Sequence, residues 1–301
     1  MDAKFRSELR FLDSWSRALR LHQWAKNFLV FVPLIAAHKV QHAELLMPAM
    51  LAFLCFGLAA SSAYVLNDFL DLDADRKHPY KRDRPFAAGE LSLAHGGVVA
   101  FVLSLTAMVI AAMSLPPAFV AVLAAYLALT TLYSAYLKRF ALLDVLTLAG
   151  LYTLRIIGGG AAVDVPVSFW LLAFSIFLFL SLAVVKRVTE LLAVRNAGDH
   201  SPAGRGYTVD DLPVMRSLGI ASGYISVLVL ALYINSPASQ VLYRRPEVIW
   251  LLCPLLLYWI SRVWLLASRD AMHDDPIVFA AFDRVSWIVL ALGAAVAWTA
   301  S

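Results

Sequence analysis

Charged residues are scarce in this chain. Only 15% of its 301 residues are Asp, Glu, Lys or Arg, whereas 61% are hydrophobic. Soluble domains have about 25% charged and roughly 45–50% apolar residues. The deficit of charge excludes an ordinary soluble domain, because too few polar side chains are present to cover its surface, and it predicts an integral membrane protein.

Cysteine is rarer still. The two cysteines, Cys55 and Cys253, each lie inside an apolar run, which excludes a disulfide framework and favours core packing over redox or metal chemistry. The seven histidines show no zinc-type spacing. No repeat or low-complexity segment is present, and the amino-terminal residues lack the short apolar core and cleavage site of a signal peptide. The simplest division is an amino-terminal segment, 1–24, and one membrane domain, 25–301.

Long apolar runs, in contrast, are abundant. Only helices satisfy the backbone of such runs in lipid, and about 20 residues cross the hydrocarbon core. The chain is therefore expected to be all-α, with about nine transmembrane helices around a polar cavity. The runs lie near residues 25–41, 45–66, 96–114, 117–136, 142–163, 168–186, 213–234, 247–266 and 278–299.

Lys and Arg collect on one side of this expected bundle. They occur at the amino terminus, in loop 67–95, at Lys138-Arg139 and in loop 186–212. Because basic loops stay in the cytoplasm, we expect the amino terminus and the acidic loop to be cytoplasmic, in a bacterial inner (plasma) membrane. The net charge of +4 fits a face against anionic lipid, and no feature indicates a nucleic-acid partner. The sequence does not determine the oligomeric state, and a homo-oligomer is one of the alternatives.

The segment 1–24 has an apolar stripe opposite basic residues. The stripe comprises Phe5, Leu9, Leu12, Trp15 and Leu19. This spacing predicts an amphipathic helix in the membrane interface, and a solvated helix packed on the loops is the alternative.

Carboxylates gather where the second apolar run ends. Asn67 to Asp75 reads Asn-Asp-Phe-Leu-Asp-Leu-Asp-Ala-Asp. On a helix with about 100° per residue, Asp68, Asp71 and Asp75 fall within roughly 60° of one another, whereas Asp73 points elsewhere. Repelling carboxylates at a membrane boundary need a cation, and oxygen-only ligands suit Mg²⁺, which takes its remaining ligands from water and substrate phosphates. Asp68, Asp71 and Asp75 are the expected metal ligands; a helix that unwinds here would change the choice among Asp71, Asp73 and Asp75.

A basic stretch follows directly, His78-Pro-Tyr-Lys-Arg-Asp-Arg-Pro85. Its Lys and Arg side chains would neutralise the same phosphates, Arg through a bidentate fork and Lys as a point charge. Lys81 and Arg84 are therefore expected to act in catalysis with Asp68 and Asp71. A calcium loop is disfavoured because Arg occupies the Gly and Glu positions of an EF-hand. A solvated loop of mixed charge is a further alternative, against which the helical spacing of the acidic residues argues.

Polar residues inside apolar spans mark further candidate sites, because they are costly in hydrocarbon. Near the first span Arg20, Gln23 and Asn27 share a face, with Lys26 beside them; interfacial snorkelling is the alternative for Arg20 and Lys26. Asp144 and Arg155 align to within about 20° on a helix, roughly 16 Å apart along its axis. We expect both to face one cavity, with Tyr152 near them.

Three other features have structural explanations of comparable weight. The run Gly158-Gly159-Gly160 permits close approach of a ligand or of another helix. Lys186 and Arg187, with Glu190, suit either phosphate binding or positive-inside anchoring. Asp274 and Asp275 are expected to cap the last helix rather than bind metal.

The acidic motif resembles that of a known family. Asn67-Asp68-x-x-Asp71-x-x-x-Asp75, followed by Arg82-x-Arg84-Pro85 and Ala87-Ala88-Gly89, is similar to the first aspartate motif of the UbiA superfamily of intramembrane prenyltransferases. Gln23-Trp24-x-Lys26-Asn27, the insert 75–85 and Tyr133-Ser134-x-x-Leu137-Lys138 look more like its decaprenyl-phosphate phosphoribosyltransferase branch.

The resemblance implies a UbiA-type bundle, Mg²⁺ as cofactor, and transfer of phosphoribosyl from its diphosphate to a polyprenyl phosphate. Aromatic prenyltransferases carry a second Asp-x-x-x-Asp motif where this chain has Lys186-Arg-Val-Thr-Glu190, which favours the same branch. Prenyl transfer to a 4-hydroxybenzoate-like acceptor is the alternative. A transporter is disfavoured because no paired broken helices occur. The expected substrate- and phosphate-binding residues are Gln23, Lys26, Asn27, Asn67, His78, Arg82, Lys138, Asp144, Arg155, Lys186, Arg187 and Glu190.

Overall fold

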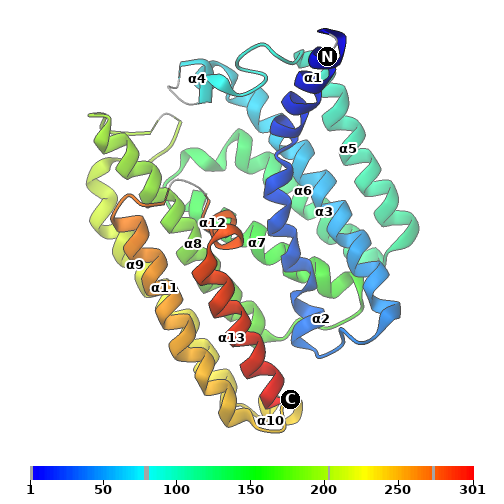
Figure 1. The fold of residues 1–301 in the computed structure, drawn as a ribbon, viewed down its shortest axis with the longest axis vertical. Coiled ribbons are helices and arrows are strands. Elements are labelled where there is room, and N and C mark those ends of the chain that lie inside the picture. Colours follow the sequence, from blue (N-terminus) through cyan, green and yellow to red (C-terminus); the bar gives the residue numbers. More distant parts are fainter. Residues whose placement is uncertain (1–2, 78–80, 203, 273–274) are drawn as a thin grey trace. The chain divides into compact units, whose positions relative to one another are not determined.

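The computed structural model describes residues 3–77, 81–202, 204–272 and 275–301, with the backbone alone for residues 3–10. All regular structure in these ranges is helical. The residues group into two compact units, Met1–Arg139 with Leu154–Pro166, and Phe140–Thr153 with Val167–Ser301. Each unit is described by itself (Figure 1). The division predicted from sequence, 1–24 and 25–301, stays a prediction.

The first unit is built on α3, the longest of its helices. Its elements are α1 (Ala3–Leu19), η1 (Leu21–Phe31), α2 (Val32–Ala36), α3 (Ala43–Leu70), α4 (Leu72–Lys77), η2 (Lys81–Asp83), α5 (Leu93–Ser114), α6 (Pro117–Ala135), η3 (Leu137–Arg139) and the later part of α7 (Leu143–Ala162). Helix α3 packs along α5 and α6, where the Phe56 ring meets Phe119 and Tyr126 edge-on. The glycines of α7 allow close packing here, since Gly158 faces Phe56 and Gly159 faces the Val30 carbonyl. Gly158 and Gly159 of the glycine run thus serve helix packing.

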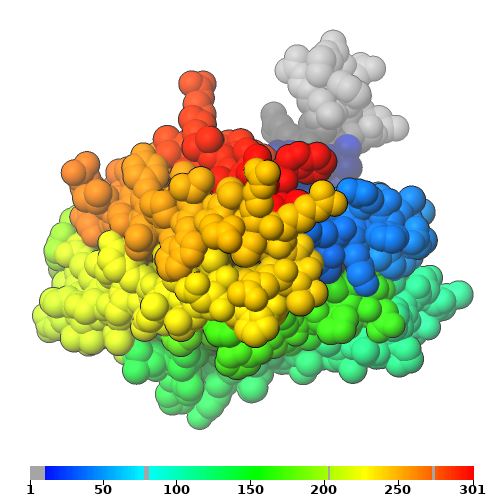
Figure 2. Space-filling view, turned by 90° about the horizontal axis from the view of Figure 1, so that it is seen from below, coloured from blue at the N-terminus to red at the C-terminus, as the bar shows by residue number. Residues whose placement is uncertain are grey.

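The second unit pairs α8 with α9. It holds the start of α7, then α8 (Phe169–Asn196), η4 (Val209–Asp211), α9 (Leu212–Ile234), α10 (Pro237–Leu242), η5 (Pro246–Leu251), α11 (Leu252–Ser268), α12 (Pro276–Phe282) and α13 (Arg284–Ala300). Small residues let these helices approach, since Gly219 faces Trp264 and Gly223 faces Ser181. Figure 2 shows the end of this unit that carries α10 and η5, in yellow, where Arg245 N donates to Ala300 O at 3.0 Å.

An internal ion pair holds the bend between α12 and α13, which is 80°. Arg262 on α11 donates to both carboxylate oxygens of Asp283 at 2.7 and 3.0 Å. Asp283 also accepts from the backbone N–H and the hydroxyl of Ser286. A charged pair therefore joins α11 to the junction of the last two helices.

The described helices bear out an integral membrane protein. Seven are long and apolar enough to cross a bilayer, or eight if the bent pair α12 and α13 forms one span. They match eight of the nine predicted runs. The first run, 25–41, instead forms η1 and the short α2. At about 2 Å per residue for 3₁₀ and 1.5 Å for α geometry, their 11 and 5 residues extend about 30 Å, so the count of nine is approximate.

Helix α1 packs on the loop before α5. The Trp15 ring meets Phe86 edge-on at 6.3 Å, and Arg17 pairs with Glu90 at 2.6 Å. Phe11 and Leu12 on the same helix are 57% and 64% exposed. Packing on the loop, the alternative considered above, holds for Trp15, and contact of α1 with the membrane interface stays a prediction.

Candidate active site

The acidic motif keeps its helical turn where α3 ends. Asp71 caps α3, α4 begins at Leu72, and Asp75 N donates to Asp71 O at 2.8 Å. Asp68 and Asp75 are both buried, Asp71 is partly exposed and Asp73 is exposed. Asp68, Asp71 and Asp75 thus turn inward and Asp73 outward, as the 100° spacing predicts.

Each of the three inward carboxylates meets a cation. Asp68 Oδ1 accepts from Arg20 at 2.5 Å and from Arg84 at 3.2 Å. Arg84 also reaches Asp75 Oδ2 at 2.6 Å, so its guanidinium bridges two carboxylates. The cluster therefore joins α3 and α4 to Arg20, before η1, and to Arg84, after η2.

The remaining carboxylate meets Lys138 on η3. Lys138 Nζ lies 2.6 Å from Asp71 Oδ1 and 3.1 Å from Asn67 Oδ1, and Asn67 Nδ2 donates to Asp71 Oδ2 at 3.1 Å. We call Arg20, Asn67, Asp68, Asp71, Asp75, Arg84 and Lys138 the ionic cluster. Three carboxylates and three cations give it no net formal charge.

The donor set of the ionic cluster fits Mg²⁺ in its chemistry. Carboxylates and an amide carbonyl are oxygen ligands of the kind that Mg²⁺ takes. Among the described residues, however, no group of three or more His, Cys, Asp or Glu side chains is arranged to hold a metal, and the Arg84 guanidinium lies between Asp68 and Asp75. Asp68, Asp71 and Asp75 would hold a metal if the cations of the ionic cluster formed ion pairs with another anion instead.

A second polar group of the first unit surrounds Arg155. Its Nε donates to Oδ1 of the fully buried Asn27 at 2.9 Å, and its NH2 donates to Tyr126 OH at 2.8 Å. Asn27 Nδ2 and Gln23 Oε1 are buried without a hydrogen-bond partner among the described residues. Since buried polar atoms are usually paired, these two atoms on η1 suit a polar ligand. Lys26, also on η1, is buried.

Asp144 in the second unit lies among cations. Its Oδ2 is 2.7 Å from Arg187 Nε and its Oδ1 is 3.2 Å from Arg205 NH1. Arg187, fully buried, also pairs with Glu190. The Tyr207 hydroxyl accepts from Leu142 N at 2.8 Å. Burial raises the pKa of the Tyr207 phenol, and the Asp144 carboxylate adds to the shift, so this hydroxyl stays protonated at neutral pH.

Lys186 meets a different carboxylate of the second unit. Its Nζ lies 3.1 Å from Asp275 Oδ2, and Tyr152 OH donates to the same oxygen at 3.3 Å. Asp275 Oδ1 accepts from Ile277 N, which confirms the predicted cap at this helix start. Asp274 lies outside the described residues.

The predicted site residues thus fall into separate groups. The predicted residues that come together in the ionic cluster are Asn67, Asp68, Asp71, Asp75, Arg84 and Lys138. Asp144 contacts Arg187 and Arg205 in the second unit, whereas Arg155 contacts Asn27 and Tyr126 in the first. Lys81 and Arg82 lie on η2, where Arg82 is exposed and 4.0 Å from Asp83. His78 lies outside the described residues.

Sequence reasoning missed several partners in these groups. Tyr126 had a signal, because Tyr126, Thr130 and Ser134 recur every four residues and all are buried on α6. Arg205 and Tyr207 lie in the segment between α8 and η4, where no periodic pattern indicates which side chains turn inward.

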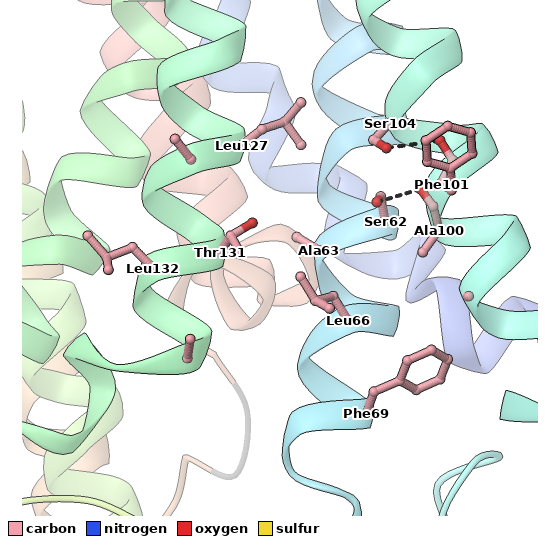
Figure 3. Close-up of a pocket in the computed structure, with 13 residues that line it drawn as sticks. Ser62, Ala63, Leu66, Phe69, Ala100, Phe101, Ser104, Leu127, Thr131 and Leu132 are labelled. Atoms are coloured by element: carbon pink, nitrogen blue, oxygen red, sulfur yellow. Dashed lines mark hydrogen bonds between the residues drawn. The ribbon is translucent and has the colours of Figure 1, made fainter. Parts of the chain in front are cut away.

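An apolar groove runs between α3, α5 and α6 of the first unit (Figure 3). Its cavity volume is about 740 Å³. The Ser62 and Ser104 hydroxyls donate to the backbone carbonyls of Ala100 and Phe101, so they leave the walls apolar. Thr131 of α6 lies opposite Ala63 and Leu66 of α3 across the groove, and Phe69 of α3 points to the α5 side. The lining residues are Ser62, Ala63, Leu66, Phe69, Gly97, Ala100, Phe101, Ser104, Leu127, Ala128, Thr131, Leu132 and Ala135.

Similar proteins have been described in several bacteria. Protein y4nM of Sinorhizobium fredii is 40% identical over 284 residues, which are 93% of this chain and 54% of that protein, so the chain spans about half of y4nM. Nodulation protein NoeC of Azorhizobium caulinodans is 36% identical over 93% of this chain and 92% of its own length. Decaprenyl-phosphate phosphoribosyltransferase of Mycolicibacterium smegmatis is 37% identical over 91% of this chain and 87% of its own.

A solved structure shares the fold. The UbiA homolog from Archaeoglobus fulgidus bound to DMAPP and Mg²⁺ superposes with a TM-score of 0.72 and 18% identity, covering 94% of this chain and 98% of that one. Residues 28–287 match the UbiA prenyltransferase family. With that match, the shared helical fold and the acidic motif at the end of α3, the chain belongs to the UbiA prenyltransferase family of membrane proteins.

Proposed function

We propose that this protein transfers a phosphoribosyl group from phosphoribosyl diphosphate to a polyprenyl phosphate. The observation that carries the proposal is the 37% identity with the phosphoribosyltransferase of M. smegmatis over 91% of the chain. The cations of the ionic cluster support it, because a phosphorylated donor and a phosphorylated acceptor both need positive partners.

The reaction exchanges one C–O bond for another at C1 of the ribose. The bond from C1 to the diphosphate oxygen breaks, its electron pair leaves with diphosphate, and a lipid phosphate oxygen forms the new bond to C1. The product is polyprenylphosphoryl phosphoribose. Since the acceptor is already an anion, no strong general base is needed.

The residues of the ionic cluster take defined roles in this proposal. Bound Mg²⁺ would supply charge neutralisation for the leaving diphosphate, held by Asp68, Asp71 and Asp75. Arg84 and Lys81 would bind the negative charge that develops on the diphosphate. Lys138 would contact a phosphate oxygen beside Asp71. Embedding in lipid keeps water from the cationic C1 carbon.

The apolar groove gives the acceptor chain a place in the same unit. Leu66 and Phe69 flank Asn67 and Asp68 in the chain, and Ala135 precedes Lys138 by one turn. We place the polyprenyl chain along α3, α5 and α6, with its phosphate near Lys138. The basic residues at this end support an orientation in which the site and the amino terminus face the cytoplasmic side of a bacterial inner membrane.

Turnover of the purified protein in lipid vesicles with Mg²⁺ tests the proposal. Labelled phosphoribosyl diphosphate with polyprenyl phosphate should give lipid-extractable label, and Asp68→Asn should abolish it without unfolding the protein. Product only from polyprenyl diphosphate with 4-hydroxybenzoate would establish prenyl transfer instead, the second candidate, which the UbiA homolog bound to DMAPP favours.

A further inference from the structure

One carboxylate oxygen in the ionic cluster accepts from two guanidinium groups. Arg20 NH2 lies 2.5 Å and Arg84 NH1 lies 3.2 Å from Oδ1 of Asp68. Asp68 is only 3% exposed, whereas the side chains of Arg20 and Arg84 are partly exposed. The buried anion is therefore neutralised by two cations that also face a space open to solvent.

Arg20 is held in place by more than this ion pair. Its backbone has φ 51° and ψ 50°, a left-handed conformation that is strained for residues other than Gly. Its guanidinium stacks over the Tyr64 ring at 4.8 Å. Strained residues persist where surrounding contacts fix them, and they concentrate at functional sites. The junction between α1 and η1 thus presents Arg20 to Asp68.

The charge balance of the ionic cluster bears on metal binding. A bare dication bound at Asp68 would lie beside two guanidiniums and would leave the neutral cluster with excess positive charge, which is unfavourable at short distance. Diphosphate arriving with the dication removes this excess and offers oxygens that Arg20 and Arg84 can bind. Metal and diphosphate should therefore assist each other's binding.

We propose that Arg20 is a diphosphate-binding residue that neutralises Asp68 until metal and diphosphate enter together, and that it then exchanges the carboxylate for a phosphate oxygen. This role rests on the proposed use of a diphosphate donor and adds a residue to it. Arg20 thereby makes metal binding conditional on the substrate.

Equilibrium binding of Mn²⁺, followed by electron paramagnetic resonance with and without inorganic diphosphate, tests this role. In the wild-type protein diphosphate should tighten Mn²⁺ binding about tenfold, as expected for coupled sites. In Arg20→Gln, Mn²⁺ alone should bind about tenfold more tightly, and diphosphate should add less than about threefold. Arg17→Gln is the matched control, because Arg17 lies on the preceding turn and pairs with Asp13 and Glu90.

Arg20→Lys separates binding from folding. It keeps the positive charge and should restore most of the coupling between Mn²⁺ and diphosphate. The proposal would be overturned if the Arg20→Gln protein had the wild-type Mn²⁺ affinity and the wild-type response to diphosphate. It would also be overturned if this protein bound Mn²⁺ alone more weakly than the wild type. Intact coupling in a protein that transfers no phosphoribosyl group would refute the proposed function and leave the role of Arg20 standing.

Discussion

Lys138 is the residue at which the proposed binding of phosphate is tested most directly. It contacts both Asp71 and Asn67, while the adjacent Arg139 is exposed. Lys138→Ala should lower kcat/KM for phosphoribosyl transfer by about 10²-fold, since one charged donor is lost from the site. Arg139→Ala should leave it near the wild-type value. Steady-state kinetics at saturating Mg²⁺ would measure both, and equal losses would favour a general surface-charge effect.

Single residues of the motif were more predictable than their partners. The spacing of Asp68, Asp71 and Asp75 predicts a shared inner face, and Arg84 bridges two of these carboxylates. Arg20 and Lys138 reach the motif across 48 and 67 positions of sequence. Such pairings depend on how helices pack, which local spacing does not encode. The sequence accordingly indicates the acidic site and its candidate cations Arg84 and Lys138, but not which carboxylate each cation contacts.

Of the two α7 glycines that pack closely, Gly159 makes the tighter approach, because it faces backbone. A Cβ at Gly159 would lie 2.0 Å from the Val30 carbonyl oxygen, whereas a Cβ at Gly150 meets nothing within 4 Å. Gly159→Ala should lower the thermal unfolding temperature in detergent, because η1 must shift away. Gly150→Ala should keep or raise the unfolding temperature. Its gain in free energy of unfolding should be at most about 1 kcal/mol, because Ala has a higher helix propensity than Gly. A Gly159→Ala protein as stable as Gly150→Ala would show that this contact is dispensable.

Filling the apolar groove tests its role as the chain-binding element. Ala128 lines the groove from α6, and Ala125 is exposed on the same helix but does not line it. Ala128→Phe should raise KM for long-chain polyprenyl phosphate several-fold with KM for phosphoribosyl diphosphate unchanged. Ala125→Phe should change neither. A KM effect on both substrates would indicate a distorted site rather than a blocked groove.

Among whole elements, eight of the nine apolar runs form the predicted long helices, the bent pair included, whereas the first run forms a 3₁₀ helix and a short α-helix. Run length and hydropathy indicate that a segment crosses the bilayer, and eight runs correspond to helices or to the bent pair. The same pattern does not distinguish 3.0 from 3.6 residues per turn, so it missed the 3₁₀ geometry of Leu21–Phe31. The pattern also does not determine where a helix ends. Asp75, for example, lies in α4, a separate helix after the end of α3.

Stability of the molecule as a whole depends on buried charge. Asp144 and Arg187 are both fully buried and paired. Asp144→Ala should lower the free energy of unfolding by about 3–5 kcal/mol, because it leaves Arg187 buried beside fewer anions, whereas Asp144→Leu with Arg187→Met should recover most of the loss. Thermal unfolding in detergent measures both. A single variant as stable as wild type would mean that Glu190 alone satisfies Arg187.

The ion pair between Arg262 and Asp283 has a consequence for biosynthesis. The last two helices leave the ribosome after α11, and Asp283 lies at the bend between them. A lone carboxylate resists insertion into hydrocarbon, so the bent pair α12 and α13 should integrate stably only once α11 presents Arg262. The order of synthesis and the order of assembly then coincide, because the cation that pairs with Asp283 is made one helix earlier.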